Sequence, residues 1–323
     1  MENFIDYFSR SETTVNFLNA LKNRGVKQAY IFNSFDEIKN YNFALIYAQI
    51  LNCLNDNKPC LTCSNCVKIQ KQTAVDLYAF PKNTSILVDD IESIINTCYI
   101  LPNEFNYKIY ILNEFDKANL SSQNKFLKTL EEPPTNVIFI LTTSNLDKIL
   151  DTVKSRCEII NLPKIEENEF SKIFDKNLNK NILENSYYEI GKFLKLTNAE
   201  NFSEIFNFCL NLAENLNSSK QVLSYSSAIL KNMKSFEIYY LCLMNIFRDL
   251  LIVKYDRNMV INKSIIDKIS VISLGYNETA LNEILNSLVK ANMELNFNTN
   301  ESLVIDCLLL KIVEEKVKWK KKL

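Results

Sequence analysis

The sequence predicts an α/β domain with a parallel sheet covered by helices on both faces, followed by a second half that is almost entirely helical. In the first half, short apolar runs rich in β-branched and aromatic residues alternate with helical patterns, as expected for repeated strand–helix units. All six prolines lie before residue 164, and only Gly191 and Gly275 interrupt the chain beyond it. Since little breaks the later helical patterns, the second half should be helical.

Five strands are expected in the first domain, each a short run of mostly apolar residues. They are Ala29–Phe32, Val75–Phe80, Lys108–Leu112, Val137–Thr142 and Glu158–Leu162. Helical patterns separate them, and this alternation favours a parallel sheet. Pro163 closes the predicted domain, which therefore covers residues 1–163.

Helices are expected from there to the end of the chain. The three short patterns Glu166–Leu178, Leu183–Lys195 and Glu200–Leu216 predict a small bundle, residues 164–217. After the polar hinge Asn217–Lys220, longer amphipathic helices, among them Ser235–Tyr255 and Ser302–Lys318, predict a helical domain over residues 218–323. The basic run Lys316–Lys322 is interpreted as a solvated helix end or tail.

Composition narrows the function classes. The 323 residues are 47% apolar, enough for two or three globular domains, and the net charge of −1 argues against a protein that grips nucleic acid over its whole surface. No apolar run is long enough for a membrane span, and the start Met1–Asp6 does not read as a signal peptide, so we expect a cytosolic protein. Histidine is absent, which excludes Ser-His-Asp and Cys-His catalysis and every histidine metal ligand.

The segment after the first strand, Asn33–Asn42, is predicted to be a loop, and it contains no glycine. Phosphate-binding loops need glycines so that backbone N–H groups can wrap the phosphates, together with a lysine and a Ser/Thr for Mg²⁺. Lys39 is a weak alternative as a shifted phosphate-binding lysine, because neither a preceding glycine nor a following Ser/Thr accompanies it. We therefore expect no ATP to bind here.

A second part of an ATPase site is also missing at the end of the predicted strand Lys108–Leu112. An active ATPase would place there an aspartate that holds Mg²⁺, followed by a glutamate that polarises water. Asn113 stands in the first position, and an amide is a poor Mg²⁺ ligand. Glu114 follows and is interpreted as a helix-capping or surface acid rather than a catalytic one.

Four cysteines, Cys53, Cys60, Cys63 and Cys66, form a Cys-x6-Cys-x2-Cys-x2-Cys cluster. Four thiolates at this spacing can close a tetrahedral zinc site, and such a site has no open position, so its role would be structural. The alternatives are unligated thiols, an iron–sulfur cluster or a redox dithiol. The other five cysteines are expected to be buried or partly buried thiols: Cys98, Cys157, Cys209, Cys242 and Cys307.

Ser155-Arg156-Cys157 precedes the last predicted strand, and Arg156 is one of only five arginines in a lysine-rich chain. The planar guanidinium pairs bidentately with phosphate oxygens, and an arginine finger stabilises the charge on a transferring phosphoryl group. The alternative is a surface salt bridge.

Taken together, these motifs resemble one family, the delta-prime subunits of the bacterial DNA polymerase III clamp loader, which are AAA+ proteins. The resemblance rests on Gln28–Phe32, the cysteine cluster, Asn124–Pro134, Thr142–Asn145 and Ser155–Cys157, and, near the end, on Asn298–Asn300 with Leu303–Leu310. The Asn124–Pro134 segment is similar to the family's signature helix, and Thr142–Asn145 to its sensor-1 strand end. The likeness is specific over residues 28–163 and weaker beyond.

The resemblance implies an AAA+ module, a three-helix lid and a helical collar that oligomerises. It implies a catalytically inactive stator in a five-subunit ring with delta and gamma/tau subunits, part of the DNA polymerase III holoenzyme. Arg156, within Ser155–Cys157, would act in trans on ATP held by a gamma/tau subunit, while the ring loads a sliding clamp onto primer-template DNA. Structural zinc would be this subunit's cofactor, and no membrane partner is implied.

The chain departs from the family in lacking even a partial phosphate loop, in placing Asn201 near the sensor-2 arginine position, and in a slightly short first cysteine spacer. Two rival classes are weighed against it. An ATP-hydrolysing AAA+ enzyme predicts loop glycines and an acid at position 113. A zinc-containing nucleic-acid-binding module predicts basic and aromatic residues around the cysteines, whereas Asn55, Asp56 and Asn57 are polar or acidic.

Overall fold

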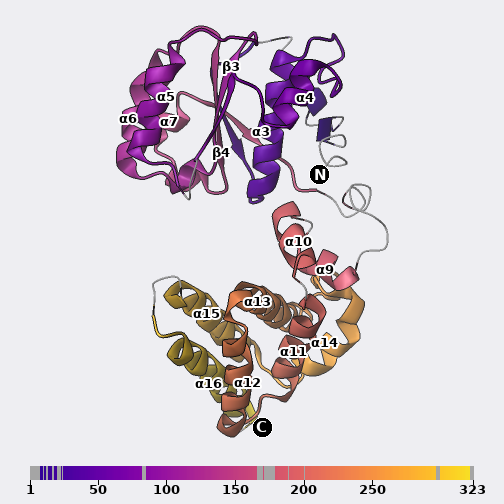
Figure 1. The fold of residues 1–323 in the computed structure, drawn as a ribbon. Coiled ribbons are helices and arrows are strands. Elements are labelled where there is room, and N and C mark those ends of the chain that lie inside the picture. The colour runs from indigo at the N-terminus through magenta and orange to yellow at the C-terminus, as the bar shows by residue number, and fades with distance from the viewer. Residues whose placement is uncertain are drawn as a thin grey trace. The chain divides into compact units, whose positions relative to one another are not determined.

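The chain divides into two compact units, Met1–Lys176 with Glu189–Gly191, and Asn177–Tyr188 with Lys192–Leu323 (Figure 1). The computed structural model describes the following residues: 8–9, 11, 14–16, 18–19, 23, 25–81, 85–165, 170, 179–187, 189–199, 201–295 and 299–320. Among these described residues, no helix is long and apolar enough to cross a membrane.

The first unit is built on a five-stranded parallel sheet in the order β2-β3-β4-β1-β5. The strands are β1 (Ala29–Asn33), β2 (Leu77–Phe80), β3 (Lys108–Leu112), β4 (Val137–Thr143) and β5 (Glu158–Asn161). All five predicted strands are confirmed; β2 begins two residues later than expected, and β5 ends one residue earlier. Strands β3 and β4 are buried along their whole length, as their nearly unbroken apolar runs predict for a parallel sheet covered on both faces.

Helices cover both faces of this sheet (Figure 1). The helices α3 (Glu37–Asn52) and α4 (Ser64–Gln70) lie on one side, and α5 (Val88–Cys98), α6 (Leu120–Glu131) and α7 (Asp151–Lys154) lie on the other. Because side chains alternate along a strand, β1 contributes to both layers: Phe32 meets Tyr47 of α3 with ring centroids 5.8 Å apart, and Ile31 joins the core under α5 and α6. The predicted α/β fold class is confirmed.

The chain beyond residue 179 is helical where the structure describes it. Its helices are α9 (Lys180–Asn185), α10 (Ile190–Thr197), α11 (Phe202–Asn215), α12 (Ser219–Lys231), α13 (Phe236–Ile252), α14 (Ile266–Ser273), α15 (Glu278–Leu295) and α16 (Glu301–Lys320). The expected helix Leu183–Lys195 is two helices instead, because the chain turns at Tyr187 with φ of 53°. The expected helix Glu166–Leu178 lies outside the described residues, apart from Phe170.

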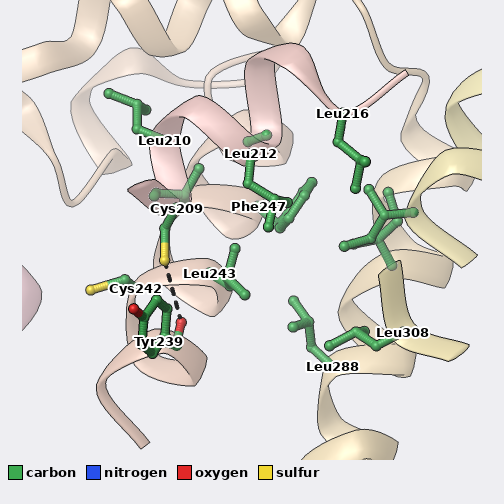
Figure 2. Close-up of a cluster of buried hydrophobic side chains, with 14 of the residues drawn as sticks. Cys209, Leu210, Leu212, Leu216, Tyr239, Cys242, Leu243, Phe247, Leu288 and Leu308 are labelled. Carbon is green, nitrogen blue, oxygen red and sulfur yellow. Dashed lines mark hydrogen bonds between the residues drawn. The ribbon is translucent and has the colours of Figure 1, made fainter. Parts of the chain in front are cut away.

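One hydrophobic core fills the second unit. Helix α13 is its centre: Phe247 and Leu243 contribute to the same cluster as Leu212 of α11, Leu288 of α15 and Leu308 of α16 (Figure 2). Helices on both sides of the expected boundary at residue 217 thus share this core, and the division into lid and collar stays a prediction. The polar hinge Asn217–Lys220 starts α12, where the Gln221 side chain accepts a hydrogen bond from the Ser218 amide at 3.1 Å.

The basic run Lys316–Lys322 was interpreted as a solvated helix end or tail. That interpretation is wrong for its first residue, Lys316. Its side chain is buried, and Nζ donates to the carbonyls of Ala213 and Glu214 at 2.9 and 2.8 Å. These are among the last carbonyls of α11, which lack partners within their own helix. The ammonium therefore caps α11 and ties it to α16.

Candidate functional site

The four cysteines of the predicted metal site lie together between α3 and α4. Cys53 follows the last residue of α3, Cys63 caps the start of α4, and Cys66 lies in its first turn. Their sulfur atoms all lie within 4.8 Å of one another, and the Sγ atoms of Cys60 and Cys66 are 4.0 Å apart. Tetrahedral Zn–S bonds of about 2.3 Å place sulfurs about 3.8 Å apart, so the spacing fits a metal ion with slight contraction.

The backbone around the cluster favours thiolates. The amide of Cys63 donates to Sγ of Cys60 at 3.3 Å, and the amide of Cys66 donates to Sγ of Cys63 at 3.5 Å. Although burial raises the pKa of Cys60, amide donors outweigh it and set the pKa at about 6, and the pKa of Cys63 is lowered in the same way. Cys53 and Cys66 are buried, and burial raises the pKa of each. The donor set can hold a metal ion.

The other cysteines lie outside this cluster. Cys98, Cys209 and Cys242 are buried and Cys157 is partly buried, as expected, but Cys307 on α16 is exposed, so that prediction was wrong for one thiol. Burial raises the pKa of Cys157 to about 12, and this thiol is therefore protonated at neutral pH and is a poor nucleophile.

The connection from β1 to α3 is much shorter than the predicted loop Asn33–Asn42. Helix α3 begins at Glu37, so only Ser34, Phe35 and Asp36 connect the two elements. Asp36 caps the helix: its carboxylate accepts a hydrogen bond from the Lys39 amide at 3.1 Å. None of these three connecting residues is a glycine.

The Lys39 side chain is engaged with the chain segment after β5. Its Nζ donates to the backbone carbonyl of Pro163, and the side chain is buried. Burial lowers the pKa of Lys39 to about 8, although the nearby Asp36 carboxylate acts in the opposite direction. This lysine is used to hold α3 to the chain segment after β5.

Acidic side chains gather at the carboxyl ends of the strands. Glu37 opens α3, Glu114 follows β3, and Lys117 of the 3₁₀ turn η1 (Phe115–Lys117) forms ion pairs with both. Burial, together with the neighbouring Glu114, raises the pKa of Glu37. Burial has the same effect on Glu114, but hydrogen bonds with Glu37 and Lys117 leave its pKa lowered. Glu114 is therefore engaged in an ion pair.

Asn113 is also committed to a structural contact. Its side-chain oxygen accepts a hydrogen bond from the Thr142 hydroxyl at 2.7 Å, and the amide of Glu114 donates to that hydroxyl at 3.0 Å. The contact joins the ends of β3 and β4 and uses the oxygen that an aspartate would offer to Mg²⁺ in an ATPase.

Arg156 lies at the opposite edge of the sheet, between α7 and the amino end of β5. Its Nη2 pairs with Glu131, the last residue of α6, and its Nη1 donates to the Thr152 carbonyl at 2.6 Å. A hollow of about 670 Å³ opens beside it and is lined by both Arg156 and Glu131. Ser155 donates its own hydroxyl to the Thr152 carbonyl at 3.1 Å. Arg156 and the β1–α3 connection therefore lie at opposite edges of the sheet.

Sequence reasoning assigned no role to Glu131, although this residue lies within the signature helix. One signal was available: a carboxylate at the end of a helix faces the negative end of the helix dipole and is unfavourable there unless a cation pairs with it. The ion pair with Arg156 supplies that cation.

Comparisons with known proteins find sequence matches over about half of the chain. Residues 10–166 match the family described as "DNA polymerase III, delta subunit". The DNA polymerase III subunit gamma of Buchnera aphidicola (subsp. Baizongia pistaciae) is 35% identical over 175 residues, which are 53% of this chain and 46% of that protein. The subunit tau of Bacillus subtilis is 31% identical over 166 residues, 51% of this chain and 30% of that protein. The chain thus matches less than half the length of these curated relatives.

Solved structures give a more distant likeness. A gamma subunit-related protein of DNA polymerase III from Thermotoga maritima has a TM-score of 0.47 at 15% identity, covering 94% of this chain and 99% of that one. The clamp loader delta protein of Bacillus subtilis has a TM-score of 0.32 at 13% identity, covering 93% and 99%. Residues 10–166 are therefore similar to a family of DNA polymerase III subunits, and about half of the chain is similar to gamma and tau subunits of that enzyme.

Proposed function

We propose that this chain is the delta-prime-type stator of a clamp loader. It binds no nucleotide, and it presents Arg156 to ATP held by a neighbouring gamma/tau-type subunit. The family resemblance implies a ring that also contains a delta subunit. The ATP-driven cycle of this ring opens a sliding clamp and loads it onto primer-template DNA. On its own, the chain has no ATPase activity.

The observation that carries this proposal is the chemistry at the carboxyl ends of β1 and β3. Phosphates bind at helix N-termini because free backbone N–H groups and the dipole favour an anion. Here the Asp36 carboxylate already occupies the start of α3, and Glu37 and Glu114 add negative charge beside it. A triphosphate would meet like charges where an ATPase offers glycine amides, a lysine and Mg²⁺.

The position of Arg156 supports action in trans. Nucleotide in this fold binds beyond the carboxyl ends of the strands, whereas Arg156 lies at the amino end of β5. A strand rises about 3.3 Å per residue, so a five-residue strand such as β1 separates the two edges by roughly 16 Å. A guanidinium on the amino edge cannot reach its own subunit's nucleotide position across the sheet, but it can face another subunit.

The isolated protein should not bind ATP. Titration with a fluorescent ATP analogue in the presence of Mg²⁺ should give no saturable signal up to millimolar analogue, because a phosphate loop and a metal-binding acid are both replaced. Saturable binding at micromolar concentration would contradict the stator assignment and favour an ATPase-related protein with residual nucleotide binding.

We also propose that Cys53, Cys60, Cys63 and Cys66 bind one structural zinc ion. Support comes from the sulfur spacing and from the amide donors that stabilise thiolates. Bound there, zinc would tie the end of α3 to the start of α4 and fix the polar insertion between them, which has no hydrophobic core of its own.

Protein purified without chelator should contain about one zinc per chain by elemental analysis. Cys63→Ser should lower the zinc content and speed amide hydrogen exchange between Cys53 and Cys66, while the sheet stays folded. Cys307→Ser, which removes an exposed thiol outside the cluster, is the matched control and should change neither value. Native protein that lacks metal would refute the zinc assignment.

A further inference from the structure

The guanidinium of Arg156 is held against its own domain rather than extended. Only 30% of the side chain is exposed. Nη2 pairs with Glu131, while Nη1 donates to the Thr152 carbonyl at 2.6 Å and to the Ser155 hydroxyl at 3.3 Å. Two separate elements, the end of α6 and the turn of α7, therefore fix the side chain in one docked position.

Glu131 is an unexpected residue for the end of a helix. It is the last residue of α6, where the dipole disfavours a carboxylate, and Lys128 is the only basic residue in that last turn. Helix stability alone therefore does not explain an acid at this position. The contact that Glu131 makes is with Arg156.

The docked guanidinium is incompletely satisfied. Its Nε is buried and has no hydrogen-bond acceptor among the described residues. A phosphate group offers several oxygens and can accept from two guanidinium nitrogens at once, so it is a better partner than Glu131 with one oxygen on Nη2. The hollow of about 670 Å³ beside the pair leaves space for the side chain to move out.

We propose that Glu131 is a positioning residue: it docks Arg156 on its own domain in the free chain and releases the guanidinium to a phosphate of the neighbouring subunit's nucleotide. The release step rests on the proposed function, whereas the docking step concerns this chain alone. Docking keeps the guanidinium against its own domain until a stronger anion competes for it. The strength of the ion pair therefore sets how readily Arg156 engages the neighbouring nucleotide.

The first test uses the isolated full chain and an arginine-selective dicarbonyl, phenylglyoxal, with the rate of Arg156 modification followed by peptide mass spectrometry. Glu131→Gln removes the charge but keeps the shape, and it should raise this rate about two- to fivefold, the equilibrium shift expected from a half-exposed ion pair. Glu132→Gln, at the next and exposed position, is the matched control and should leave the rate unchanged. Equal rates in wild type and Glu131→Gln, or equal increases in both variants, would overturn the docking step.

The second test uses the assembled ring and a double-mutant cycle. Glu131→Gln should lower the ATP concentration for half-maximal ATPase by about two- to fivefold, and it should have no effect when Arg156 is already alanine, because it acts through that residue. An undiminished effect in the Arg156→Ala background would overturn the release step. If Arg156→Ala itself leaves the ring's ATPase and clamp loading unchanged, the proposed function and the release fail, while the docking step still stands or falls by the phenylglyoxal result.

Discussion

Arg156→Ala is expected to lower ATP turnover at the neighbouring subunit's site by about 10³-fold, since loss of an arginine finger removes charge stabilisation from the transferring phosphoryl group. A ring with further ATP sites keeps its other fingers, so total ATPase should fall only in part. Clamp loading should fall further, because it needs the sites to act together. Steady-state ATPase and clamp-loading rates on primed DNA, measured with the reconstituted ring, check both values.

Two variants make this result specific. Arg156→Lys should restore little activity, because an ammonium is a point charge and cannot reproduce the planar fork of a guanidinium. Arg257→Ala is the matched control: Arg257 also forms an exposed ion pair, with Asp267, but lies in the second unit. Its loss should leave ATPase and loading near wild-type values.

Arg156→Ala should still assemble with its partners and keep its melting temperature, because the ion pair that it loses is half-exposed and contributes little to stability. Wild-type clamp loading by an intact ring that contains Arg156→Ala would mean that this residue is a surface salt-bridge arginine. The alternative interpretation of Ser155-Arg156-Cys157 would then hold.

The sheet could be predicted because its signals are local. Each strand is a short apolar run, and helical patterns separate the runs. The succession of strands and helices along the chain therefore follows from the sequence alone. The cysteine cluster could be predicted from spacing in the same way. The Cys-x2-Cys repeat brings Cys60, Cys63 and Cys66 close together at the start of α4. The sequence does not predict the strand order β2-β3-β4-β1-β5, because strand pairing depends on contacts between distant segments.

Contacts between distant segments also explain the errors. Lys316 belongs to a basic run, but its charge is satisfied by carbonyls about a hundred residues earlier, and no local pattern reveals such partners. The loop Asn33–Asn42 was expected to be longer than it is: Asp36 caps the helix, and Asn40 donates to the carbonyl of Thr143, about a hundred residues later, at 2.8 Å. Because of this tertiary packing, residues Glu37–Asn42 form the first turns of α3 instead of a loop.

A buried polar cluster in the second unit was missed for the same reason. Asp249 lies in α13 within a mostly apolar sequence, and it is completely buried. Its carboxylate accepts hydrogen bonds from the amides of Ile261 and Asn262 at 2.9 and 2.8 Å, and from the Asn262 side chain at 2.8 Å. Arg248 adds an ion pair at 3.1 Å. The segment after α13 is thereby fixed to that helix.

The cluster extends from Asn262 to α9. Asn185 donates to the side-chain oxygen of Asn262 at 2.8 Å and accepts from Asn245 of α13 at 3.0 Å. All three asparagines are buried, so these amides have little access to water and depend on one another. Asp249 therefore supports the position of α9 through Asn262 as well as the segment that it contacts directly.

Asp249→Ala should lower the free energy of unfolding of the second unit by about 3–5 kcal/mol, because it leaves two backbone N–H groups, an amide and Arg248 without their buried acceptor. Urea denaturation followed by circular dichroism should show the lower midpoint, and hydrogen exchange should become faster in α9 and in the segment after α13. Asp267→Ala, which removes an exposed aspartate paired with Arg257, is the control and should change little. A loss below about 1 kcal/mol for Asp249→Ala, the range of a surface ion pair, would mean that water replaces the carboxylate and that the cluster does not hold α9 in place.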